Sequence, residues 1–195
     1  GKRQQLIKSK RTIDSICKGF SNWMTKAATI CEEKGLLVIK CVHEMQVNHV
    51  MKELAASFKC KGNAEVVYVS DVNIAPAEST ALFQFLSFIK NLHVLHIWNS
   101  TMELLGARHL AKFLLKNANC QLTELHMAEN NLTNESVGCL TDALKSENCK
   151  LTELNISFNN LTDESVRCLS DALKSENCKL TKLDIRHNNL TDESG

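Results

Sequence analysis

Residues 149–177 read CKLTELNISFNNLTDESVRCLSDALKSEN, and this stretch decides the fold because the chain repeats it. The preceding copy, residues 120–148, reads CQLTELHMAENNLTNESVGCLTDALKSEN and is identical at 21 of 29 aligned positions. A third copy, CKLTKLDIRHNNLTDESG, begins at Cys178. Repetition at a fixed spacing predicts a stack of similar units, in which each unit buries its apolar face against its neighbours.

Each copy is predicted to be a strand, a turn and a helix. Leu154 and Ile156 alternate at the period of a strand and are expected to point inward, and residues 153, 155 and 157 are expected to point outward. From residue 162 onward the apolar positions follow helical spacing, at Val166, Leu169 and Leu173. Thr162 suits the N-cap of this helix. The copies therefore predict a parallel sheet on one side of the stack and helices on the other.

Weaker copies precede these three. Residues 92–119 and 64–91 keep the apolar spacing, with Ser100 and Val72 at the position of Asn159, and Pro76 suits a first helical turn. We expect about four and a half repeats over residues 63–195. The last copy stops inside its helix, so we expect its strand to be incompletely covered.

The repeat resembles the leucine-rich repeat of the ribonuclease-inhibitor subtype, whose units of about 28–29 residues carry a full helix. That resemblance implies an α/β horseshoe with parallel strands on the concave face and helices on the convex face. It also implies that Asn130, Asn159 and Asn188 form a structural asparagine ladder, each bonding the backbone of neighbouring turns. Such bonding is physically sensible because unpaired backbone groups in a buried turn are costly.

Residues 1–62 are predicted to form an all-helical N-terminal flank. Apolar residues recur every three or four positions from Ile13 to Cys31 and again from Leu36 to Phe58, with a break expected at Lys34-Gly35. The second stretch resembles the end of the helical domain that precedes the repeats in NLR proteins, the nucleotide-binding leucine-rich-repeat receptors. The matching residues are Cys41, Glu44 and Gln46.

This resemblance implies the sensing and autoinhibitory repeat region of a cytoplasmic innate-immune receptor. Its implied partners are a protein or microbial ligand on the concave face and the nucleotide-binding module of the same full-length chain. Two other classes stay open at this point: a ribonuclease-inhibitor-like enzyme inhibitor, and a GTPase-activating repeat protein. Inhibition of ribonucleases and stimulation of GTP hydrolysis would identify them.

The residues themselves predict no enzyme, no cofactor and no metal site. No phosphate-binding glycine loop and no C-x-x-C pair occur, and His43 and His49 are six residues apart, which does not suit a zinc-binding helix. The net charge is only +1, although residues 1–40 alone carry +6. Neither a nucleic-acid partner nor a membrane is therefore expected. The nine cysteines are an odd number, and five recur at repeat positions, so we expect packed thiols rather than disulfides. The N-x-[ST] tripeptides come largely from the repeated turn and are not expected to be glycosylated.

The predicted recognition surface is where the copies differ. Four of the eight differences between the two full copies are contiguous, at residues 126–129 and 155–158. A constant frame with a variable inner surface is what a scaffold for recognition would show, and exposed aromatic and charged side chains suit an interface. The candidate binding residues on the concave face are Tyr68, His96, Trp98, His126, Glu129, Asn155, Phe158, Asp184, Arg186 and His187.

Overall fold

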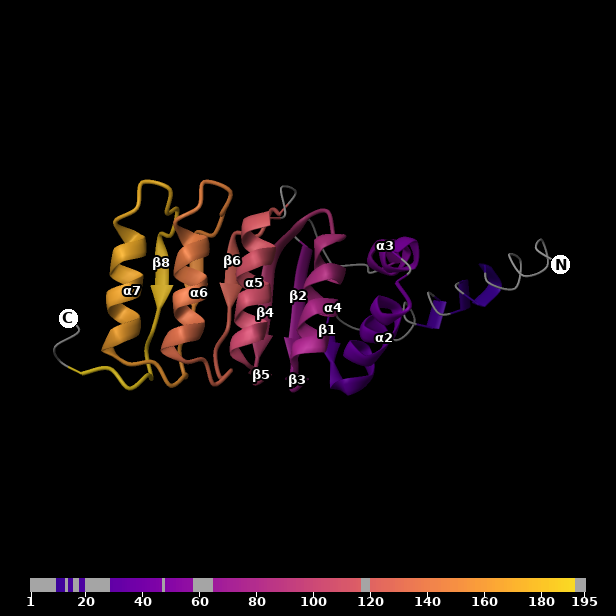
Figure 1. Cartoon of the computed structure of the whole chain (residues 1–195), viewed down its shortest axis with the longest axis horizontal. Helices are drawn as coiled ribbons and strands as arrows, with labels where there is room; N and C mark the ends of the chain where they lie inside the picture. Colours follow the sequence, from indigo (N-terminus) through magenta and orange to yellow (C-terminus); the bar gives the residue numbers. More distant parts are fainter. Residues whose placement is uncertain are drawn as a thin grey trace.

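The computed structural model describes residues 10–12, 14–15, 18–19, 29–46, 48–57, 65–116 and 120–191. Strand–helix units follow one another along the long axis of the molecule, with the helices side by side on one face and the strands behind them (Figure 1). Each unit places its strand beside the strand of the previous unit. The fold is therefore the α/β repeat stack that the sequence predicts.

Six strands form one sheet in which every pair is parallel. Their order is that of the chain: β1 (Thr29–Cys31), β2 (Glu65–Ser70), β4 (Leu92–Trp98), β6 (Glu124–His126), β7 (Glu153–Asn155) and β8 (Lys182–Asp184). A second, two-stranded sheet joins β3 (Asn73–Ile74) to β5 (Thr101–Met102). Sequential neighbours in a parallel sheet require a crossover in every unit, and the helices supply it.

The helices pack in the same order as the strands. They are α2 (Glu32–Glu44), α3 (Asn48–Ser57), α4 (Pro76–Ser87), α5 (Leu104–Lys116), α6 (Asn134–Leu144) and α7 (Asp163–Leu173). From α4 to α7 each helix contacts the next, and α2 and α3 pack against α4. Pro76 begins α4, where its missing N–H costs little, and Thr133 caps α6 by accepting a hydrogen bond from the backbone N–H of Ser136.

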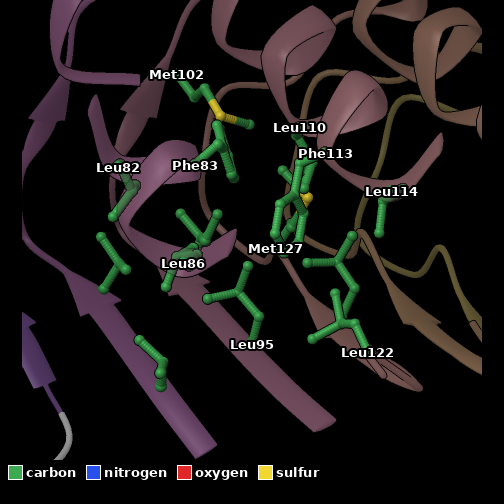
Figure 2. Packing of buried hydrophobic residues seen from close by; sticks show 14 of the residues in the cluster. Leu82, Phe83, Leu86, Leu95, Met102, Leu110, Phe113, Leu114, Leu122 and Met127 are labelled. Carbon is green, nitrogen blue, oxygen red and sulfur yellow. The ribbon is translucent and has the colours of Figure 1, made fainter. Parts of the chain in front are cut away.

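One continuous apolar core lies between the helices and the sheet. Figure 2 shows Leu86 of α4 and Leu110 of α5 facing Leu95 of strand β4, with Met127 and Leu122 of the next unit beside them. Leu154 and Ile156 of the decisive stretch are buried, as their period-two spacing predicts. Burial between units, rather than within one, is what makes the stack cooperative.

The N-terminal flank is not all-helical. Thr29–Cys31 form strand β1, which pairs with β2 and extends the sheet, and Ile30 is fully buried. The helical interpretation of Ile30 and Cys31 was wrong because a short apolar run has no periodicity that separates a buried strand from a buried helix. The apolar positions predicted at 13, 16, 17, 20, 23, 24 and 27 lie outside the described residues.

The predicted break at Lys34-Gly35 was also wrong. Helix α2 runs through both residues, and the chain turns instead at Met45 and Gln46, where Gln46 has a left-handed φ of 56°. Helix α2 buries Leu36, Ile39 and Val42, and this packing outweighs the helix-breaking tendency of one glycine. Gln46 consequently lies beyond the helix that carries Cys41 and Glu44.

Two inward–outward predictions failed at the level of single side chains. Ser157, expected to point outward, is buried, because the turn after β7 folds it back onto Asn155, whose Oδ1 accepts hydrogen bonds from the Ser157 N–H and hydroxyl. Leu173, expected to be buried, is 46% exposed, whereas the equivalent Leu144 is 2% exposed. Helix α7 packs on α6, the helix that ends at Leu144, but no described helix packs on the corresponding side of α7.

Candidate functional site

The candidate recognition surface is the face of the six-stranded sheet that points away from the helices, called here the strand face. Strand pairing brings five of the predicted residues into one row across it: Tyr68, His96, His126, Asn155 and Asp184. Residues two positions farther along continue as a second row, in which Ser70 lies beside Trp98. The predicted residues of the row therefore share one surface, although they come from five strands.

Aromatic rings stack in the N-terminal half of this row. The ring centroids of Tyr68 and His96 are 4.6 Å apart, and those of His96 and His126 are 4.3 Å apart, with nearly parallel planes in both pairs. The stacking follows from parallel register, which places equivalent side chains of adjacent strands side by side. His126 also lies 3.6 Å from the carboxylate of Glu124.

His96 is the strongly perturbed titratable group on the strand face. Burial first, and the neighbouring His126 ring second, together lower its pKa to about 4. Burial disfavours the charged imidazolium, and a second histidine nearby opposes a positive charge. His96 is therefore neutral at pH 7.

Beside the stack, a hollow of 280 Å³ opens between β2 and β4. Tyr68, Ser70, His96 and Trp98 contribute to its lining. Trp98 is 49% exposed and Tyr68 is 43% exposed, so two large rings meet solvent at this point. Exposed aromatic groups around a hollow are typical of sites that anchor a partner.

The C-terminal half of the strand face is polar. Asp184 accepts hydrogen bonds from Nε and Nη2 of Arg186 at 3.0 and 2.7 Å, and this pairing lowers the pKa of Asp184 and raises that of Arg186. Lys182 pairs with Glu153 at 2.5 Å. Asn155 accepts hydrogen bonds from the backbone N–H and hydroxyl of Ser157. These side chains satisfy one another, so they cost little to present to solvent.

The residue before each ladder position has a left-handed backbone. Their φ values are 57°, 47°, 58°, 53° and 55° at Asp71, Asn99, Glu129, Phe158 and His187. Such values are unusual for a bulky residue, and the repeated turn imposes them here. The turn places Phe158 at 49% exposure, stacked on His187 with centroids 4.1 Å apart. Asn99 donates a hydrogen bond to the Asp71 carboxylate at 2.7 Å.

The turns that display these residues are held by asparagine side chains. Oδ1 of Asn159 accepts hydrogen bonds from the backbone N–H groups of Asn130 and Leu132, at 3.0 and 2.9 Å. Asn188 bonds Asn159 and Leu161 in the same way, and Asn130 bonds Ser100. Ser100 stands in the ladder of its own repeat, where its hydroxyl accepts from the Val72 N–H at 3.4 Å. Asn130 and Asn159 are buried.

Three acidic residues that the structure places on this surface were not among the sequence candidates: Asp71, Glu124 and Glu153. Asp71 follows β2. Glu124 lies on β6, where it is in register with Val94 of β4 and Glu153 of β7. Their positions relative to the ladder residue would have found them, because Asp71 occupies the same position as Glu129. The weaker upstream copies concealed this alignment.

Several histidines and cysteines lie off this surface. His43 bonds Gln84 at 2.5 Å across a 440 Å³ hollow on the helix side, which Phe83 and Phe113 also line. His49 is exposed. Burial raises the pKa values of the Cys120 and Cys149 thiols, which keeps them protonated and unreactive. Within the described ranges, no three His, Cys, Asp or Glu side chains gather as metal ligands would.

The comparisons with known proteins agree with this geometry. Residues 118–140, 147–170 and 176–195 match the leucine-rich repeat family. These three matches support a leucine-rich-repeat protein, and such repeats are in general non-enzymatic modules that bind proteins. No curated protein matches the chain. Among the residues that the structure describes, every helix is too short or too polar to cross a membrane.

Proposed function

We propose that this chain is a non-enzymatic recognition scaffold that binds a protein ligand on its strand face. The observation that carries the proposal is that the structural residues recur between copies whereas the exposed residues of the strand face differ. Ladder asparagines, capping threonines and core leucines recur from copy to copy, while the exposed positions change from His126 and Glu129 to Asn155 and Phe158, and then to Asp184 and His187. Displaying different side chains on a constant frame is how repeat proteins generate binding specificity.

Exposure on the strand face supports the same proposal. Tyr68, Trp98 and Phe158 are each more than two-fifths exposed, and all three lie on strands or turns of one surface. Large aromatic side chains are costly to leave in water and contribute strongly when a partner buries them. Proteins therefore keep them on a surface where a partner covers them.

We further propose that the chain is the sensing and autoinhibitory repeat region of a cytoplasmic innate-immune receptor of the NLR type. Its support is the order of the elements, in which two successive helices, α2 and α3, follow β1, precede β2 and pack on α4. The nucleotide-binding module of the same full-length chain would then be a second partner. The coding sequence upstream tests this part: a phosphate-binding loop is expected, and another domain type would refute it.

Capture from host cytosol tests the strand face. Wild-type protein, Trp98→Ala, Arg186→Glu and Lys145→Ala are immobilised at equal density, and captured proteins are quantified by mass spectrometry. Lys145 is exposed at the end of α6 and serves as the control. The amount of a specific partner that is captured is expected to fall about tenfold or more with either strand-face variant, because substitution of a central interface residue weakens binding by about this much. Capture should persist with Lys145→Ala.

Circular dichroism must show the same fold for all four proteins. Equal recovery by every variant would refute the strand face as the binding surface. So would a loss with Lys145→Ala as large as the loss with Trp98→Ala.

A further inference from the structure

The hollow between β2 and β4 has an unpartnered aromatic face. The Trp98 ring is half exposed, and within the described residues it makes no ring stack or hydrogen bond. Tyr68 and His96, stacked on each other, line the same hollow. At 280 Å³, the hollow has room for one long side chain of a partner. The geometry thus offers one open aromatic face beside an apolar floor.

Carboxylates lie on both sides of Trp98. The N–H of Asp71 donates to the Trp98 carbonyl at 3.3 Å, which places Asp71 at the adjacent end of β2. On the other side, the N–H of Asn99 donates to the Ala128 carbonyl at 3.4 Å, and Glu129 follows directly. Trp98 therefore ends its strand between two acidic residues.

Within the described residues, the strands that carry these carboxylates and Trp98 supply no basic side chain to neutralise them. Strands β2, β4 and β6 contain neither lysine nor arginine. The exposed carboxylate of Glu129 has no hydrogen-bond or ion-pair partner in the described part of the chain. Two described basic groups of the strand face, Lys182 and Arg186, are on or after β8 and already pair with acidic residues. The surroundings of the hollow are consequently negative.

We propose that this hollow binds a lysine or arginine side chain of the protein partner, with its cationic group over the Trp98 ring and between Asp71 and Glu129. The inference rests on the proposed function and names the chemistry that the partner must present. A cation is attracted to the face of an aromatic ring, most strongly to that of tryptophan. The apolar stem of the partner's lysine or arginine can lie against Tyr68. Two carboxylates beside the ring strengthen the preference for positive charge.

The state of His96 fits this assignment. Its lowered pKa leaves the ring uncharged at pH 7, so the hollow holds no positive charge that would repel an incoming cation. A neutral imidazole stacked on Tyr68 instead adds apolar surface. An acidic peptide or a nucleic acid would meet the negative charges of Asp71 and Glu129 here and is disfavoured.

The test uses the whole chain and two defined probes. The pentapeptide acetyl-Gly-Ala-Arg-Ala-Gly-amide and its citrulline analogue, which is neutral and nearly isosteric, are titrated into ¹⁵N-labelled protein at neutral pH. NMR shifts of the Trp98 indole and of backbone amides 68–71, 96–99 and 128–129 report binding. The arginine peptide is expected to shift these signals and to bind about 3–5-fold more tightly than the citrulline peptide.

Variants identify the groups responsible. Trp98→Leu keeps an apolar side chain but removes the aromatic ring. Its affinity for the arginine peptide, measured from the backbone amide shifts, should be about 3–5-fold lower than that of the wild type. Glu129→Gln keeps the shape of the side chain but removes its charge. The affinity for the arginine peptide should fall by about 2-fold and should depend less on salt concentration. Glu176→Gln, an exposed acidic residue after α7, is the matched control and should change nothing.

Equal binding of the two peptides would overturn the inference, as would unchanged binding by Trp98→Leu or shifts confined to another surface. The capture experiment does not depend on these peptides. A failed titration combined with Trp98-dependent capture would therefore refute the cation subsite alone, whereas failure of the capture experiment would refute the proposed function.

Discussion

At the scale of the single residue, Asn159 shows how one side chain can hold two successive turns. Its oxygen accepts from two backbone N–H groups of the previous unit, and its Nδ2 donates to the carbonyls of Met127, Ile156 and Ser157. The side chain is almost fully enclosed. Removing it leaves buried backbone groups without partners, which is expensive in a site that water cannot enter.

We expect Asn159→Ala to lower the free energy of unfolding by about 1–3 kcal/mol, measured by urea denaturation. Asn160→Ala is the matched control. Asn160 is exposed, and its side chain bonds only the Asn131 side chain and solvent, so its loss should cost less than about 0.5 kcal/mol. Similar costs for the two variants would mean that Asn159 does not hold the turns.

His96 predicts a dependence of stability on pH. Its pKa is about 4 in the folded chain, compared with 6.5 for an ordinary histidine, so the unfolded chain binds more protons between these values. The stability from neutral His96 is therefore fully present above 6.5 and is lost as the pH falls toward 4. Between roughly pH 7.5 and pH 5, we expect the free energy of unfolding of the wild type to fall by about 1 kcal/mol more than that of His96→Gln. This figure is reduced to allow for solvent around the ring. Parallel pH profiles in urea denaturation would contradict this.

At the scale of the element, helix α5 approaches strand β5 through a glycine. A methyl group on Gly106 would lie 2.3 Å from Cγ of Met102, which is buried. The close packing of the units therefore depends on the missing side chain at this position. Gly138 in helix α6 differs, because a methyl group there would meet no atom within 4 Å.

We expect opposite effects from the same substitution in these two helices. Gly106→Ala should destabilise the protein by about 1–3 kcal/mol through overpacking against Met102. Gly138→Ala should stabilise it by about 0.5–1 kcal/mol, because alanine favours the helix and meets no obstacle. Thermal unfolding of both variants beside wild type measures the difference, and stabilisation by Gly106→Ala would show that Met102 can move aside.

At the scale of the whole molecule, position in the stack determines what an identical residue does. Leu144 and Leu173 end equivalent helices in copies that are nearly identical, yet Leu144 is 2% exposed and Leu173 is 46% exposed. The helix that Leu144 ends, α6, has α7 packed on it, whereas no described helix packs on the far side of α7. In a quasi-one-dimensional stack, stability depends on the interfaces between neighbouring units.

We expect Leu144→Ala to lower the free energy of unfolding by about 2–4 kcal/mol and Leu173→Ala to lower it by less than about 1 kcal/mol, measured by urea denaturation. Amide exchange should also be faster in α7 and β8 than in α5 and β4, since β8 is paired on one side only within the described strands. Equal costs for the two leucines would mean that another surface covers Leu173 in solution.

Much of the fold could be predicted from the residues because it is local and repeated. The spacing of Leu154, Ile156 and Leu169 and the position of Pro76 each follow from the geometry of one strand or one helix. Thr162 stands at the N-cap of α7 as predicted but makes no side-chain capping hydrogen bond, whereas the equivalent Thr133 does. The three family matches lie within this repeated part. On the strand face, the candidate residues could be named from the variation between copies, but the partners of each side chain could not.

Sequence alone determined the period, the strand–helix unit and the face that varies, since these depend on residues close together in the chain. Tertiary structure alone decided that Ile30 belongs to a strand, that Leu173 is exposed, and that Tyr68, His96 and His126 stack. The reason is physical: burial, strand pairing and ring stacking are contacts between segments about one repeat or more apart. Copies with the same sequence pattern therefore acquire different surroundings from the units on either side of them.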